Sequence, residues 1–182
     1  MKSLLLATAM ILSAPIAIAQ DCIDPTELAG QDGEREFTQS RHLNGVPRPL
    51  TSSGVVSFSD EEIIWSVTTP LTIVTRIAPE GMTQSIEGSN PEPIGAGGAN
   101  NPLLSDSGLL DLIRGDLSQL DQRYDIVRAD DDAGWSLDLT PKQDEMGEYV
   151  DRISISGCSA VDVISVFQSN ADMISVAFQK DS

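Results

Sequence analysis

The chain has 182 residues, of which 40% are hydrophobic, 21% are charged and only 4% are aromatic. This length suits one domain, and the apolar fraction is large enough to build a hydrophobic core. Lys and Arg number 11 against 28 Asp and Glu, which gives a formal net charge of −17. A protein that binds a nucleic-acid backbone by counterion release needs clustered Lys and Arg. The composition therefore excludes nucleic-acid binding.

Residues 1–19 have the order of a secretory signal peptide. Lys2 supplies a positive charge, a short apolar stretch follows, and small residues end the segment as Ala17-x-Ala19. We predict cleavage after Ala19 and one mature domain over 20–182. A short N-terminal membrane anchor is the less favoured alternative, because the apolar run is shorter than the roughly 20 residues that a spanning helix needs. The mature protein is expected to be exported, soluble and acidic.

Two cysteines agree with export. Cys22 lies close to the predicted mature N-terminus, and Cys158 lies near the other end of the chain. An oxidising compartment and an even count favour a disulfide between them over two free thiols. A catalytic thiol would need a basic neighbour to lower its pKa, and the sequence around Cys158 supplies none.

Most of the predicted mature chain alternates with the period of two that is typical of β-strands. The turns between successive strands are short, and strands joined in this way pair antiparallel. The predicted strands are 34–43, 54–59, 63–68, 72–78, 82–86, 124–129, 135–139, 149–156, 160–168 and 172–179. Alternation is clearest in Val161, Val163, Ser165 and Phe167, and again in Ile174, Val176 and Phe178.

Two segments interrupt this pattern. Residues 87–102 contain four Gly and three Pro and are expected to form a long loop. A helical segment follows, with Ser107 as a possible N-cap and Gly115 dividing it into two short pieces. Its leucines either pack on the sheet or form a movable lid over a cavity, and their spacing favours packing. The apolar residues near helical spacing are Leu109, Leu112, Ile113, Leu117 and Leu120.

Roughly ten strands with one helical insertion predict a mainly β fold with short helices. Large twisted sheets tend to curl, and a curled sheet of eight or more strands can enclose a ligand. The expected architecture is therefore a strongly curved antiparallel sheet, or an unclosed β-barrel, with a helical cover.

The common catalytic and metal-binding residue sets are missing. His42 is the only histidine, it lies at the end of a predicted strand, and no G-x-S-x-G nucleophile motif accompanies it. One histidine and two paired cysteines cannot form a zinc site. The run Asp130-Asp131-Asp132 lacks the alternate spacing and the later Glu of a calcium loop, and it predicts a solvated turn. We expect no enzymatic activity, no cofactor and no metal.

From Phe37 to Phe178, a series of short segments occurs in the same order and with the same spacing as in one known protein family. The segments are 37–41 (FTQSR), 49–54 (PLTSSG), Phe58, Ile64-Trp65, Pro70, 109–117 (LLDLIRGDL), 134–137 (GWSL), 139–141 (LTP), 152–155 (RISI) and 172–178 (DMISVAF). Together with the predicted signal peptide, this series resembles the periplasmic outer-membrane lipoprotein carriers of the LolA-like family.

The resemblance implies an unclosed β-barrel in the periplasm whose apolar concave side, covered by short helices, holds the acyl chains of lipoproteins. It also implies an inner-membrane ABC-type lipoprotein release complex as donor and an outer-membrane receptor as acceptor. We expect such a carrier to be a monomer. Each exposed CH₂ costs about 0.8 kcal/mol in water, so carriage of acyl chains across an aqueous gap needs a shielding cavity.

Two departures from the family pattern concern the cargo. The carriers have an arginine about six residues before the tryptophan, thought to latch the lid, and Ser59 occupies that position here. The family begins with a sizeable amphipathic helix, whereas residues 24–33 are few and glycine-broken, so a Cys22–Cys158 bridge would pin the N-terminus instead. These differences resemble a divergent branch that carries other lipids, such as glycolipids.

The expected acyl-binding residues come from the strands and from the helical cover. Each of them could equally be ordinary core, and a register error of one residue would turn a strand's set outward. Two other hypotheses stay open: a small interaction or scaffold protein with a filled barrel, and an enzyme on a lipid-like substrate. The expected lipid-binding residues are Val56, Phe58, Ile63, Trp65, Val67, Ile73, Ile153 and Ile155 on strands, with Leu109, Leu112 and Ile113 on the cover.

Overall fold

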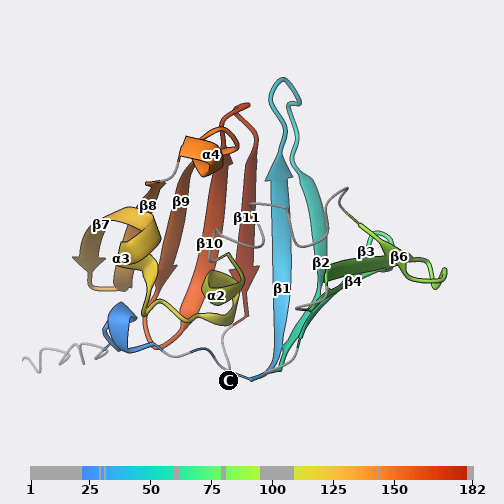
Figure 1. The fold of residues 1–182 in the computed structure, drawn as a ribbon, viewed down its shortest axis with the longest axis horizontal. Helices are drawn as coiled ribbons and strands as arrows, with labels where there is room; N and C mark the ends of the chain where they lie inside the picture. The colour runs from blue at the N-terminus through green and yellow to red at the C-terminus, as the bar shows by residue number, and fades with distance from the viewer. Residues whose placement is uncertain are drawn as a thin grey trace, which may run out of the picture.

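An antiparallel sheet of 11 strands is the framework of the molecule (Figure 1). This computed structural model describes residues 22–28, 30, 32–59, 62–78, 81–94, 109–142 and 144–179, with only the backbone at 109, 110, 113, 144 and 145. The strand order is β6-β5-β4-β3-β2-β1-β11-β10-β9-β8-β7. Because β6 and β7 are its two edges, the sheet does not close. The predicted mainly β fold, an unclosed curved antiparallel sheet with short helices, is confirmed.

Two meanders meet at the centre of the sheet, where β1 pairs with β11. The first consists of β1 (Gly33–His42), β2 (Leu50–Phe58), β3 (Ile63–Thr69), β4 (Ile73–Ala78), β5 (Gly81–Ile86) and β6 (Glu92–Pro93). The second consists of β7 (Tyr124–Asp131), β8 (Gly134–Pro141), β9 (Val150–Gly157), β10 (Val161–Gln168) and β11 (Met173–Phe178). The short helical elements are η1 (Pro25–Glu27), α2 (Leu109–Arg114), α3 (Leu120–Arg123) and α4 (Asp144–Gly147).

The structure corrects several predicted boundaries. Strand β2 begins at Leu50 rather than at Gly54, because the first hairpin continues its pairing as far as Arg41 opposite Leu50. The two-residue strand β6 lies within 87–102, which was predicted to be a loop, and helix α4 was not predicted at all. The division of the helical segment at Gly115 is confirmed, since Gly115 has a φ of +82° directly after α2. The predicted N-cap, Ser107, lies outside the described residues.

Gly54 permits a close approach of two strands where the sheet curls. A Cβ at this position would lie 1.8 Å from the backbone oxygen of Ser66 on β3. The register between β2 and β3 also shifts at this point, as in a β-bulge, which bends a strand and increases its twist. Phe37 lies opposite Gly54, and the Trp65 ring packs on Phe37 with 4.2 Å between centroids. The missing side chain therefore lets two aromatic rings cover the bend.

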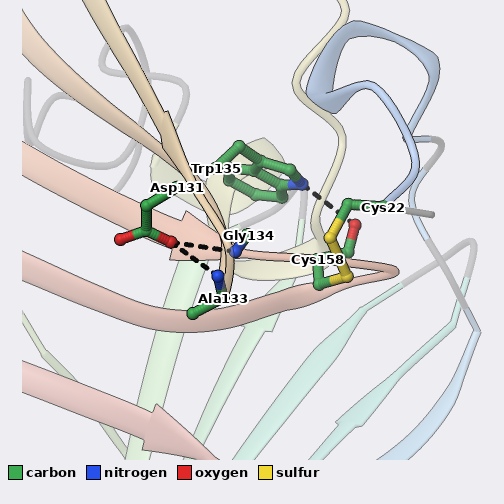
Figure 2. Close-up of a disulfide and its surroundings, with 6 residues drawn as sticks. All are labelled: Cys22, Asp131, Ala133, Gly134, Trp135 and Cys158. Atoms are coloured by element: carbon green, nitrogen blue, oxygen red, sulfur yellow. Dashed lines mark hydrogen bonds between the residues drawn. A yellow bond between two sulfur atoms is a disulfide. The ribbon is translucent and has the colours of Figure 1, made fainter. Parts of the chain in front are cut away.

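The disulfide between Cys22 and Cys158, the pair that the sequence predicted, fixes one corner of the sheet (Figure 2). The backbone oxygen of Cys158 accepts hydrogen bonds from the backbone N–H of Ile23, at 3.1 Å, and from the Trp135 indole N–H, at 3.0 Å. The N-terminal segment, β8 and the β9–β10 turn thus converge on one carbonyl group.

The run of three aspartates spans the end of β7 and the hairpin turn to β8, with Asp130 and Asp131 on the strand and Asp132 in the turn. The Asp131 carboxylate accepts hydrogen bonds from the backbone N–H groups of Ala133, at 2.8 Å, and Gly134, at 3.1 Å (Figure 2). Side-chain acceptors of this kind stabilise turns by mimicking the backbone. The predicted hairpin turn is therefore present, and it is held by the Asp131 carboxylate.

An ion pair holds the N-terminal segment against the edge strand β7. Arg128 Nη1 lies 2.7 Å from the Asp24 carboxylate, which also accepts hydrogen bonds from the side chain and backbone N–H of Thr26. The Arg128 guanidinium, followed by these Thr26 contacts, holds the pKa of Asp24 well below its usual range. The segment that precedes β1 is thus attached by a disulfide and by an ion pair.

Candidate ligand-binding cavity

One face of the sheet carries the apolar side chains of both meanders. Residues directly opposite each other in an antiparallel pair share a face. The registers of neighbouring strands place all eight predicted strand residues on this one face together with Ile164, Val176 and Phe178. The eight are Val56, Phe58, Ile63, Trp65, Val67, Ile73, Ile153 and Ile155. We call this face the concave face.

An apolar cavity of about 290 Å³ opens on the concave face. Its walls come from the centre of the sheet, from β3 and β4 across the curl, and from α4. Trp65 and Ile153 are the two predicted residues that line it. The described lining residues are Gln39, Trp65, Thr75, Ile77, Met146, Val150, Ile153, Ile164, Val166, Gln168, Ile174, Val176 and Phe178.

The other predicted strand residues lie in the surroundings of the cavity rather than in its described wall. Val56, Ile63 and Ile155 are fully buried in the hydrophobic core, and Phe58 is nearly so. Val67 is half-buried against that core, and Ile73 is half-buried on β4. They are not among the described residues that line the cavity, and their role in lipid binding stays a prediction. The cavity occupies only part of the concave face, and closer packing fills the rest.

The helical cover differs from the prediction in the same way. Leu112 is fully buried in the core and does not line the cavity, which supports the packing interpretation of the leucines. The side chains of Leu109 and Ile113 lie outside the described residues. Met146 on α4 takes the covering position instead. The sequence offers little signal for this, because α4 has only four residues and one apolar side chain.

A bulge in β10 explains why the sequence missed part of the wall. The register shifts between Val161 and Val163. As a result, Val161 is buried in the core, and Ile164 and Val166, not Val163 and Phe167, lie on the concave face. Phe167, which appeared to alternate with Val161, lies on the opposite face, with the Arg152 guanidinium 4.0 Å from its ring centroid. An inserted residue reverses the parity of a strand, and no local sequence pattern marks it here.

No charged side chain occurs among the described residues that line the cavity. Ten of the 13 are hydrophobic, and Gln39, Thr75 and Gln168 are polar but neutral. Thr75 Oγ1 accepts a hydrogen bond of 3.1 Å from Gln84 Nε2. Arg35 lies on the concave face beside the wall, with its guanidinium 4.7 Å from the Phe178 ring centroid, and donates to the backbone oxygen of Val161 at 2.7 Å. The cavity therefore offers an apolar surface with a few neutral hydrogen-bonding groups.

Helix α2 is tied to the turn after β2. Arg114 Nη2 donates a hydrogen bond of 2.5 Å to the backbone oxygen of Ser59, the position at which the family resemblance places an arginine. The guanidinium thus comes from the helix, and the acceptor comes from the end of the strand. Arg114 Nε is buried without a hydrogen-bond partner in the described part of the chain.

Residues considered for catalysis or metal binding lie apart from the cavity. His42 is exposed at the end of β1, with Nε2 at 3.2 Å from Ser40 Oγ. The described residues contain no group of three or more His, Cys, Asp or Glu that could hold a metal ion. Within the same part of the chain, no helix has the length and apolarity needed to cross a membrane.

Burial raises the pKa of Tyr124, at the start of β7, to about 12, and this predicts an alkaline loss of stability. The unfolded tyrosine titrates near pH 10, so the unfolded state releases this proton first as the pH rises. Stability contributed by the neutral phenol is complete below pH 10 and falls by about 1.4 kcal/mol at pH 11. Urea unfolding at pH 9 and pH 11 should show this difference between the wild type and Tyr124→Phe. Equal pH dependence in both proteins would contradict it.

Comparison with known proteins finds no matching family model and no matching curated protein. Among solved structures, a DUF1329 family protein from Desulfovibrio piger aligns over 83% of this chain and 85% of its own, at 13% identity and a TM-score of 0.41. A putative outer membrane lipoprotein-sorting protein domain from Vibrio parahaemolyticus aligns over 81% and 84%, at 8% identity and a TM-score of 0.35.

Proposed function

We propose that this protein is a non-enzymatic carrier that shelters an acyl chain of a lipid or lipoprotein in the concave-face cavity. The observation that carries the proposal is the wall itself, in which ten hydrophobic residues and three neutral polar ones surround about 290 Å³. Burial of acyl chains is favourable by about 0.8 kcal/mol per CH₂, and an uncharged wall imposes no cost for desolvating ions.

The filled-barrel alternative is less consistent with this geometry. Protein interiors are packed to the density of organic crystals, and voids larger than a water molecule are few. An apolar cavity of about 290 Å³ is close to the lower end of the size range of pockets that bind small molecules. A ligand that enters from one side and leaves again needs such an accessible space.

The proposed location is the periplasm. The predicted signal peptide would export the chain to this compartment, and its oxidising conditions permit the Cys22–Cys158 disulfide. In this proposal the donor is an inner-membrane ABC-type release complex and the acceptor is an outer-membrane receptor, the partners that the sequence resemblance implies. Since Ser59 replaces the expected arginine, lipoproteins and other acylated lipids are both included as cargo.

A matched pair of tryptophan variants tests the cavity. Val176 lines it, whereas its neighbour Ala177 lies exposed on the opposite face of β11. Val176→Trp is expected to fill the space and weaken binding of a fluorescent fatty-acyl probe at least tenfold, while Ala177→Trp should bind as the wild type does. Native mass spectrometry of the purified mature protein would identify the lipid that the wild type retains and Val176→Trp lacks.

The alternative outcomes are distinct. Equal binding by both variants would place the acyl site outside the cavity. A wild-type protein that carries no lipid and refuses the probe would argue against a carrier and favour the interaction protein.

A further inference from the structure

We propose that the tip of the β1–β2 hairpin, residues 46–50, docks on the surface of a bilayer that contains anionic phospholipid. Figure 1 shows this hairpin reaching the top of the molecule beside the β10–β11 turn. The tip consists of Val46, Pro47, Arg48, Pro49 and Leu50, all of them exposed. This inference goes beyond the proposed carriage of acyl chains, because it concerns a different surface and a different ligand.

The tip presents apolar side chains to solvent. Val46 is 47% exposed and Leu50 is 58% exposed, which places both among the exposed large hydrophobic residues of the described chain. The two prolines restrict the backbone around them, so little conformational freedom is lost when the tip meets a partner. Paired aliphatic side chains held outward in this way suit insertion into the apolar boundary of a bilayer.

The charge around the tip is opposite to that of the rest of the chain. The net charge is −17, yet no Asp or Glu occurs from Phe37 to Ser59. Arg48 has no ion pair or hydrogen bond of its side chain in the described structure, and a free guanidinium can bind lipid phosphate. Near the tip, the Asp172 carboxylate lies 3.9 Å from the Arg41 guanidinium.

This difference in charge between the tip and the rest of the protein determines which part of the protein meets the membrane first. An acidic body is repelled by anionic headgroups, although salt screens the repulsion beyond about 8 Å at physiological ionic strength. The tip, residues 46–50, lies in the acid-free stretch 37–59 and combines exposed aliphatic groups with a cation that has no ion pair among the described residues. Repulsion of the body and attraction of the tip therefore favour contact through the hairpin first.

The hairpin is braced against an element that also forms the cavity wall. The backbone N–H of Asn44 donates to the Asp172 carboxylate at 2.8 Å, and its side-chain amide donates to the backbone oxygen of Asn170 at 3.2 Å. The same turn begins at Gln168, a cavity-lining residue whose backbone N–H donates to the backbone oxygen of Asp172 at 2.9 Å. Docking through the tip would thus bring the edge of the cavity close to the membrane.

Vesicle co-sedimentation of the mature protein tests this proposal. We expect measurable binding to vesicles of phosphatidylethanolamine and phosphatidylglycerol. Leu50→Ser should weaken this binding about tenfold, and Arg48→Gln about fivefold. Leu71→Ser is the matched control, since Leu71 is 53% exposed on the β3–β4 turn, and it should bind as the wild type does.

Binding of the acyl probe separates this test from the carrier proposal. The hairpin variants should retain wild-type probe affinity, which also shows that they are folded. No vesicle binding by the wild type would overturn membrane docking, and a protein partner would then be the better explanation of the exposed tip. Equal loss in Leu50→Ser and Leu71→Ser would overturn the assignment to the hairpin.

Discussion

Gly54→Ala is expected to destabilise the protein by about 3 kcal/mol or more and to weaken binding of the acyl probe. The new Cβ would lie 1.8 Å from the backbone oxygen of Ser66 and 2.9 Å from the Cα of Val67. Both neighbours are backbone atoms, so no side chain can rotate away, and β2 and β3 must separate. Because Trp65 on β3 forms one wall of the cavity, this movement changes the binding site as well.

Equilibrium urea unfolding measures this loss, and Gly147→Ala is its control. Gly147 ends α4, and a Cβ there would meet nothing within 4 Å. The same glycine-to-alanine change should therefore leave stability within about 1 kcal/mol of the wild type. If the two variants were equally stable, the close approach at Gly54 would have no role in the curl of the sheet.

Removal of the disulfide is expected to have the largest effect on stability. Cys22 and Cys158 are separated by 136 residues, and the chain-entropy model gives about 5 kcal/mol for a loop of this length. The double variant Cys22→Ala/Cys158→Ala should approach this loss, since it leaves no free thiol behind. Wild-type protein unfolded in the presence of a reductant should lose a comparable amount.

The double variant supplies the control for that experiment, because reductant should not change its stability. A loss below about 1 kcal/mol in the double variant would contradict the prediction. It would mean that the N-terminal segment separates from the Cys158 corner before the sheet unfolds, so that the cross-link spans a part of the chain that does not share in the cooperative transition.

Outside the bulged strand β10, the apolar alternation of the sequence was sufficient to assign the concave face. All eight strand residues predicted to face inward do so, from Val56 on β2 to Ile155 on β9. The reason is physical: side chains alternate strictly along a strand, and a sheet with one buried face shows this period in its sequence. The short turns between strands likewise determined antiparallel pairing within each meander.

The division of that face into core and cavity could not be obtained in the same way. Ile153 lines the cavity, whereas Ile155, two residues along the same strand and on the same face, is fully buried in the core. Which of them meets open space depends on the curl at Gly54 and on Met146 reaching over from α4. These are contacts between segments far apart in the chain, and neither leaves a periodic signal.

The sequence by itself determined the class of the fold, the face that carries the apolar side chains and the pair of cysteines available for a disulfide. These follow from local properties: the alternation of side chains, the length of turns, and an even cysteine count. Only the tertiary structure decided that β1 joins β11, that a bulge turns Ile164 inward in β10, and that the cavity lies between the sheet centre and β3–β4. The pairing of distant strands, the register shift in β10 and the curvature of the sheet depend on contacts between residues far apart in the chain. The local sequence pattern does not encode such contacts.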